Sequence, residues 1–218
     1  HNQGEWVTKM ARMASLDYGA DWVINNDADE FWWPKHHANL KESFLSLDKT
    51  CNIVEASRKN FVFNNDEAEQ NNRFYQKMLY KEKQSLNTSG RPLPPKQAHR
   101  GNHSIVVSDG NHSVEGFETK EINKSIIEIL HFPIRSKTQF TNKILHGGAA
   151  LERNDSISKN TGSTWRKLYQ QLQTSGNLDT FLSSQYYDKK KIEETLKEGS
   201  IVLDERLKKS LEALYNES

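Results

Sequence analysis

The chain has 218 residues, a length that suits one substantial core or a core with a small appended subdomain. Its 30 Lys and Arg and 29 Asp and Glu give a formal net charge of +1, which argues against a nucleic acid or a membrane surface as its partner. No apolar run approaches the roughly 20 residues of a transmembrane helix, and one cysteine, Cys51, excludes an intrachain disulfide framework and favours a reducing, cytoplasmic location.

The first part of the chain alternates helical and extended patterns, which is typical of an α/β protein. Apolar residues at helical spacing predict a helix over residues 6–16, and Gly19 is expected to end it as a C-cap. The short apolar run 21–24 follows at once as a buried strand. The further elements expected are a helix over 38–47, strands over 53–56, 60–63, 105–108 and 126–130, and a helix over 137–151.

The rest of the chain is expected to be loops and charged helices. Residues 64–76 are polar and predict an exposed excursion, and residues 89–104 are rich in proline and glycine and predict a loop. Beyond Asn154 the sequence predicts helices over 165–172, 188–197 and 204–215, with one strand signal at 201–203. We therefore expect an α/β core over residues 1–153 and a helical C-terminal extension over 154–218.

An acidic cluster follows the first predicted strand in the run DWVINNDADEFWWP. If that strand continued, Asp27 and Asp29 would point to one side, and Ala28 and Glu30 to the other, because side chains alternate along a strand. Two carboxylates at the end of a buried strand suit Mg²⁺ or Mn²⁺, which keep coordination positions open for substrate phosphates. The alternative is a solvated acidic turn. The large apolar residues Phe31, Trp32 and Trp33 favour a binding cleft over such a turn.

Several motifs in the chain resemble those of GT-A-fold glycosyltransferases of the family-2 type. The acidic run resembles their D-x-D-E-F motif, and residues 131–136, His-Phe-Pro-Ile-Arg-Ser, resemble a later H-F-P-x-R-S motif that is followed here by Gln139-Phe140 and Lys143. His99-Arg100 and Gly110-Asn111-His112 resemble elements between the two. The likeness spans about residues 6–165, but a first strand and nucleotide-base pocket have no counterpart. We therefore expect the sequence to be a fragment with material missing upstream.

The resemblance implies a GT-A-like mixed sheet flanked by helices and a metal-dependent, inverting transfer of a sugar. The donor would be a UDP- or GDP-sugar, the acceptor a glycan or a lipid-linked molecule, and the cofactor Mn²⁺ or Mg²⁺. The metal ligands it implies are Asp27, Asp29 and His131. The donor-binding residues expected are Asp27, His112, Arg135, Ser136 and Lys143.

A general base must accept the proton of the acceptor hydroxyl. Asp109 and Glu115 are the candidates, with Asp109 ranked first because it precedes the Gly-Asn-His element.

Other functions stay open at this point. The histidines His99, His103, His112 and His131 raise the alternative of a zinc site, although their spacing fits no compact zinc motif. A nucleotidyltransferase and a carbohydrate-binding or scaffolding module without turnover are alternatives to the transferase. The sequence also leaves self-association open.

Overall fold

The computed structural model of the chain describes residues 3–64, 73–87, 90–154 and 162–216. These residues form two compact units, which are described here one at a time. The sheet unit comprises residues 2–59 and 85–131, and the helix unit comprises residues 60–84 and 132–218. Compactness thus divides the chain at other positions than the expected boundary at 153/154, and the division into a core and an extension stays a prediction.

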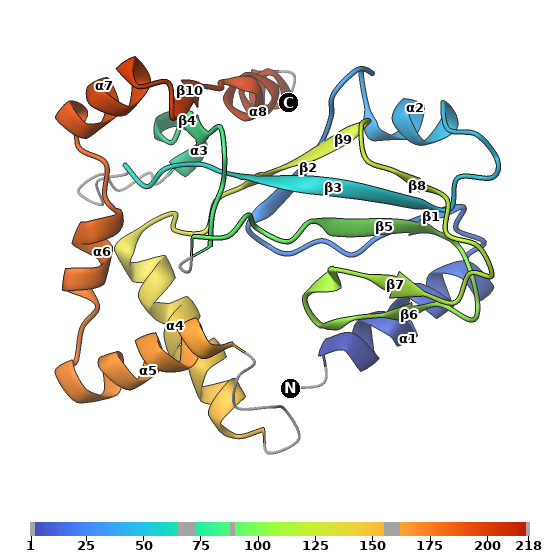
Figure 1. Cartoon of the computed structure of the whole chain (residues 1–218), viewed down its shortest axis with the longest axis horizontal. Coiled ribbons are helices and arrows are strands. Elements are labelled where there is room, and N and C mark those ends of the chain that lie inside the picture. Colours follow the sequence, from blue (N-terminus) through green and yellow to red (C-terminus); the bar gives the residue numbers. More distant parts are fainter. Residues whose placement is uncertain (1–2, 65–72, 88–89, 155–161, 217–218) are drawn as a thin grey trace. The chain divides into compact units, whose positions relative to one another are not determined.

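A six-stranded mixed sheet forms the centre of the sheet unit, and its main path runs in the order β1-β5-β3-β9-β2 (Figure 1). Neighbouring strands are antiparallel in the pairs β1–β5, β5–β3 and β9–β2, whereas β8 runs parallel to β3. The strands are β1 (Trp22–Ile24), β2 (Glu30–Pro34), β3 (Ile53–Asn60), β5 (Lys96–Arg100), β8 (Ile122–Asn123) and β9 (Ile127–His131). The α/β class expected from the sequence is confirmed.

Two helices of the sheet unit pack on opposite faces of this sheet, α1 (Gln3–Leu16) and α2 (Leu40–Leu45). Side chains alternate between the faces of a strand. Val54 accordingly belongs to a core with Phe44 of α2, while its neighbour Ile53 belongs to a core with Ala11 of α1. Both faces are therefore buried where β3 begins, and there the strand carries two adjacent apolar residues, Ile53 and Val54.

Helix α1 ends where the sequence predicts. Gly19 has a φ of 61°, and the amide of Ala20 donates to the carbonyl of Ala14 at 2.9 Å, so the expected glycine C-cap is confirmed. A small hairpin packs against α1. It consists of β6 (Val106–Val107) and β7 (Val114–Glu115), joined by the single turn η1 (Asp109–Asn111). This hairpin brings the Gly-Asn-His element into the sheet unit.

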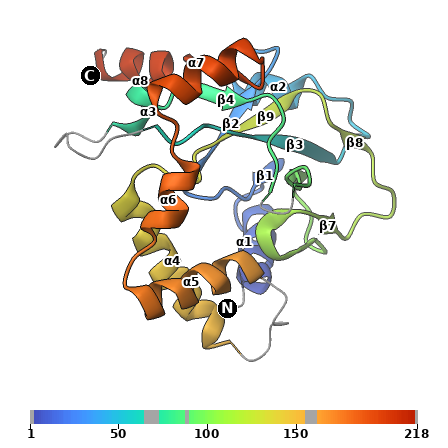
Figure 2. The same cartoon turned by 60° about the vertical axis from the view of Figure 1, so that its left-hand side comes forward.

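The helix unit is built around a core of its own, to which α4 and α5 contribute and where they lie side by side (Figure 2). The core residues are Phe63, Ile134, Phe140, Ile144, Leu168, Leu178 and Leu182. Its helices are α3 (Phe74–Lys77), α4 (Lys137–Glu152), α5 (Ser163–Ser175), α6 (Asp179–Gln185), α7 (Lys189–Lys197) and α8 (Arg206–Asn216). Strands β4 (Tyr80–Glu82) and β10 (Ile201–Leu203) pair antiparallel, which confirms the strand signal at 201–203.

Three expectations from the sequence need correction. Residues 96–100, expected in a loop, form β5, an inner strand of the sheet between β1 and β3. The expected strands 53–56 and 60–63 are one strand, β3, followed by single bridges at Phe61 and Phe63. In the expected polar excursion, residues 65–72 lie outside the described residues, but Tyr75 of α3 is buried.

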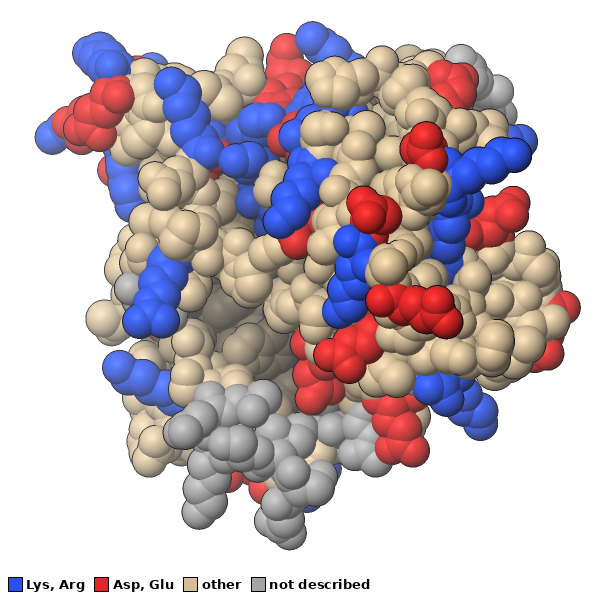
Figure 3. All heavy atoms as spheres, turned by 45° about the vertical axis from the view of Figure 1, so that its right-hand side comes forward, with Lys and Arg blue, Asp and Glu red and all other residues tan. Residues whose placement is uncertain are grey.

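The space-filling view shows blue and red side chains interspersed rather than gathered by sign (Figure 3). This agrees with the near-zero net charge. Among the residues that the structure describes, no helix is long and apolar enough to cross a membrane.

Candidate functional site

The candidate site continues the sheet face that packs under α2. On each of β2, β3, β5 and β9, an apolar core residue and a charged or ionisable residue lie two positions apart. On all four strands the charged or ionisable residue is the one nearer to the same end of the sheet. The pairs are Trp32 and Glu30, Ala56 and Arg58, Ala98 and Lys96, and Ile129 and His131. Because side chains two apart share a face, these four polar groups converge at one end of the sheet.

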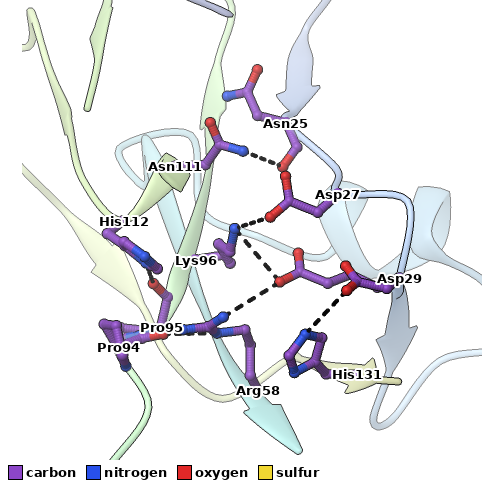
Figure 4. A network of polar contacts seen from close by, with 11 residues as sticks. Asn25, Asp27, Asp29, Arg58, Pro94, Pro95, Lys96, Asn111, His112 and His131 are labelled. Carbon is purple, nitrogen blue, oxygen red and sulfur yellow. Dashed lines mark hydrogen bonds and ion pairs between the residues drawn. The ribbon is translucent and has the colours of Figure 1, made fainter. Parts of the chain in front are cut away.

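Asp27 and Asp29 lie beside this end in the connection between β1 and β2. They are in a turn, closed by a hydrogen bond from the Glu30 amide to the Asp27 carbonyl at 3.1 Å, and not in a strand. The expectation that strand alternation aligns the two carboxylates, with Glu30 facing away, is therefore wrong. The turn instead places Asp27 beside Lys96 and Asp29 beside His131 in a network of polar contacts (Figure 4). Glu30 also approaches Lys96.

Two cationic residues, the buried Lys96 and the half-buried Arg58, hold part of this network. Lys96 Nζ lies 2.5 Å from Asp27 Oδ2 and 3.5 Å from Glu30 Oε1, and its side chain is 2% exposed. Arg58 Nη1 lies 3.8 Å from Glu30 Oε1, and Arg58 Nε donates to the Pro94 carbonyl at 3.0 Å. Burial raises the pKa of the Glu30 carboxyl; Lys96 and Arg58 oppose this effect, while Asp27 and Asp29 reinforce it.

Asp29 and His131 form the second part of the network. His131 Nε2 lies 3.7 Å from Asp29 Oδ2, and both side chains are 12% exposed. The pairing of β2 with β9 supports this approach, because Glu30, the neighbour of Asp29, pairs with His131. The structure thus brings together two of the three residues expected to bind a metal, and their role as ligands stays a prediction.

The chemistry of this pair suits a divalent ion. Bonds of about 2.1 Å let two ligands of one ion stand up to roughly 4 Å apart, so one ion can bond both atoms. Within the described residues no group of three or more His, Cys, Asp or Glu converges, and Asp27 Oδ2 already accepts from Lys96. The pair therefore offers two ligands, and Mg²⁺ or Mn²⁺ would fill its other positions with water and substrate oxygens.

The Gly-Asn-His element lies next to Asp27. Gly110 and Asn111 both have positive φ, 73° and 59°, and Asn111 Nδ2 donates to the Asn25 carbonyl at 3.3 Å. Asn25 Nδ2 and Asn111 Oδ1 are buried and have no hydrogen-bond partner in the described part of the chain. Such atoms are costly unless a partner reaches them, so they offer hydrogen bonds to a polar ligand.

His112 completes this side of the site. Its Nδ1 lies 2.8 Å from the carbonyl of Pro95, the residue before Lys96. Burial lowers the pKa of His112, and Arg58 and Lys96 add to this effect, so the ring is neutral at pH 7. A Cβ on Gly110 would lie 2.8 Å from His112 Nε2, which explains the glycine at that position.

The two candidate bases lie on the β6–β7 hairpin. Asp109 is exposed, and its Oδ1 accepts from the amide of Gly4 at 2.9 Å in the first turn of α1, where a negative charge is favourable. Glu115 is exposed in β7, opposite Val106. Asp109 therefore has a structural contact that Glu115 lacks in the described hydrogen bonds, and the choice between the two bases stays open.

Three of the expected donor-binding residues, Arg135, Ser136 and Lys143, belong to the helix unit. Ser136 is the N-cap of α4, since its hydroxyl oxygen accepts from the Gln139 amide at 3.1 Å. Arg135 lies over the Phe74 ring at 5.4 Å, and Lys143 lies over the Trp165 ring at the same distance. The R-S-K-T-Q run thus starts a helix, and its role in donor binding stays a prediction.

The side chains of His99 and Arg100 are held by contacts within the sheet unit. His99 is fully buried on β5, whereas the Arg100 side chain stacks on Trp22 and donates to the Cys51 carbonyl at 2.8 Å. Among the described residues, His99, His103, His112 and His131 do not form a group that could hold zinc.

Sequence reasoning missed Lys96, Arg58 and Glu30 as members of the site. For Arg58 and Lys96 the signal that could have found them is the alternation along VEASRKN and KQAHR, which sets each two positions from a small buried alanine. Glu30 stands two positions from the buried Trp32. Neither a known family model nor a curated protein matches the chain.

Proposed function

We propose that the chain is a metal-dependent glycosyltransferase that uses a nucleotide-sugar donor. The observation that carries the proposal is the approach of Asp29 and His131, residues from distant parts of the sequence, at the polar end of a buried sheet. The resemblance of the two motifs that contain them to GT-A-fold glycosyltransferases supports the same activity. The GT-A-like fold and the choice of UDP or GDP and of a glycan or lipid-linked acceptor belong to this proposal.

In the proposed reaction Asp29 and His131 hold Mg²⁺ or Mn²⁺. When bound, the ion offsets the negative charge on the diphosphate that leaves the sugar. Asn25 and Asn111 offer buried hydrogen-bonding atoms to the donor beside Asp27. Asp109 or Glu115 would accept the proton of the acceptor hydroxyl.

The test is thermal unfolding with UDP or GDP, with Mn²⁺ or with a chelator. A ligand that binds only the folded chain stabilises it by about 2.7 kcal/mol at a hundredfold excess over its Kd. For a chain of this size that raises the Tm by roughly 5–10 °C. We expect the rise to require Mn²⁺ and to disappear in Asp29→Ala.

Glu121→Ala, which removes an exposed carboxylate from the same unit, serves as the matched control and should keep the full rise. A rise in Tm that sugars cause equally with and without Mn²⁺ would instead identify a carbohydrate-binding module. No response to either diphosphate in the presence of Mn²⁺ would contradict the proposal.

A further inference from the structure

The acidic residues of the site already have a cation of their own. Lys96 is buried on β5, and its ammonium group lies between the carboxylates of Asp27 and Glu30. A buried ammonium loses its hydration, so it is retained only where nearby carboxylates compensate its charge. Asp27 and Glu30 provide that compensation here.

The contacts divide the three carboxylates into two groups. The carboxylates of Asp27 and Glu30 both approach the Lys96 ammonium, and Arg58 of β3 approaches Glu30. Asp29 faces His131 instead. The Lys96 ammonium therefore lies against Asp27 and Glu30, whereas Asp29 lies beside the His131 imidazole and also interacts electrostatically with Arg58.

A fixed ammonium also repels a second cation. Like charges that lie close together away from bulk water repel each other, and a divalent ion feels twice the repulsion of a monovalent one. A divalent ion at Asp27 Oδ2 would occupy the place that Lys96 Nζ holds at 2.5 Å. The same ion between Asp29 and His131 meets a carboxylate and an imidazole.

We propose that Lys96 is a resident cation that positions Asp27 and Glu30 and restricts a bound divalent ion to Asp29 and His131. The inference rests on the proposed function and deepens it by excluding Asp27 from direct ligation. Asp27 is then left to meet the donor directly or through water. Lys96 is a positioning residue, because it acts through the carboxylates and touches no reacting atom.

The test measures Mn²⁺ binding to the purified protein by electron paramagnetic resonance, without nucleotide. As a single substitution, His131→Gln should weaken Mn²⁺ binding more than about tenfold, since even outer-shell partners of a metal contribute that much. In Lys96→Met, Mn²⁺ should bind about tenfold more tightly or better, because the repelling charge is gone. His131→Gln should then have little effect, because the ion has moved to Asp27 and Glu30.

Two control variants distinguish the loss of the Lys96 charge from a general loss of stability. Lys124→Met removes a lysine of the same unit that pairs with Glu55 at 2.9 Å and is 66% exposed, and it should leave Mn²⁺ binding unchanged. Lys96→Met is expected to lower the Tm because it leaves two carboxylates uncompensated. Glu30→Gln added to Lys96→Met should recover most of that loss and return Mn²⁺ binding toward its original strength.

The outcomes distinguish the inference from the proposed function. If Mn²⁺ binds and needs His131, but Lys96→Met leaves both the affinity and that need unchanged, the inference is overturned and the proposed function stands. If Mn²⁺ binding to the unmodified chain depends on neither Asp29 nor His131, both are overturned.

Discussion

At the scale of single residues, His99 shows how burial fixes a protonation state. It is completely buried on β5, its Nδ1 lies 2.9 Å from the Arg100 carbonyl, and its Nε2 has no hydrogen-bond partner in the described part of the chain. Burial lowers the pKa of His99, and the backbone contact only partly opposes this. The folded chain therefore keeps the ring neutral where the unfolded chain, with a pKa of about 6.5, takes up a proton.

This difference predicts acid sensitivity. Because the unfolded state binds more protons, the free energy of unfolding should fall as the pH drops below about 6.5, by up to about 1.4 kcal/mol per pH unit for each such group. His112, with its pKa lowered in the same direction, adds to the slope. Urea unfolding between pH 5 and 7.5 measures it, and His99→Leu should flatten the curve. An unchanged slope in His99→Leu would show that His99 is not among the groups responsible.

Residues of the site were predictable in part. Asp27, Asp29 and His131 stand out because carboxylates and a histidine at strand ends are a chemical signal that the sequence displays directly. Glu30, Arg58 and Lys96 give no such signal, since each is an ordinary charged residue until the strand register shows that they share a face. The turn that gathers Asp27 and Asp29 was wrongly taken for a continuing strand.

At the scale of elements, β5 shows where the sequence pattern fails. The segment KQAHR follows Pro94 and Pro95 and contains no β-branched or aromatic residue, so propensity predicts a loop. The strand forms because its polar side chains find partners inside the unit. Lys96 pairs with Asp27, and Gln97 Oε1 accepts from the Val114 amide at 2.9 Å. Tertiary contacts of this kind are invisible to local reasoning.

The two glycines of α4 make a second point at this scale. Gly147 and Gly148 do not end the helix, which continues to Glu152. A Cβ on either would collide with α5, at Trp165 for Gly147 and at Tyr169 for Gly148. The glycines therefore let the two helices approach closely, and Trp165 packs against the core of the helix unit.

Gly148→Ala should destabilise the chain even though alanine favours a helix by about 1 kcal/mol over glycine. The inserted methyl group overpacks the contact with Tyr169, which costs typically about 1–3 kcal/mol. Urea unfolding of Gly148→Ala, Tyr169→Ala and the double variant measures this, and the double variant should lose less than the sum of the two. A neutral or stabilising Gly148→Ala would contradict the close packing of α4 and α5.

At the scale of the whole molecule, composition and patterning were sufficient for the α/β class. They predicted both charged terminal helices and the β10 strand, because these depend on local periodicity. They could not predict that residues 60–84 join the C-terminal helices in one compact unit, since that grouping depends on long-range contacts such as the β4–β10 pair. Local patterns predict elements better than they predict how distant segments group.

The central claim about the molecule is that Asp29 and His131 bind one divalent ion. Pulsed electron paramagnetic resonance of Mn²⁺ bound to the chain tests it most directly, because a coordinated imidazole nitrogen couples to the electron spins of the metal. We predict coupling to one histidine nitrogen that disappears in His131→Gln, together with a loss of Mn²⁺ binding in Asp29→Asn. Bound Mn²⁺ without nitrogen coupling, or coupling that persists in His131→Gln, would contradict the assignment.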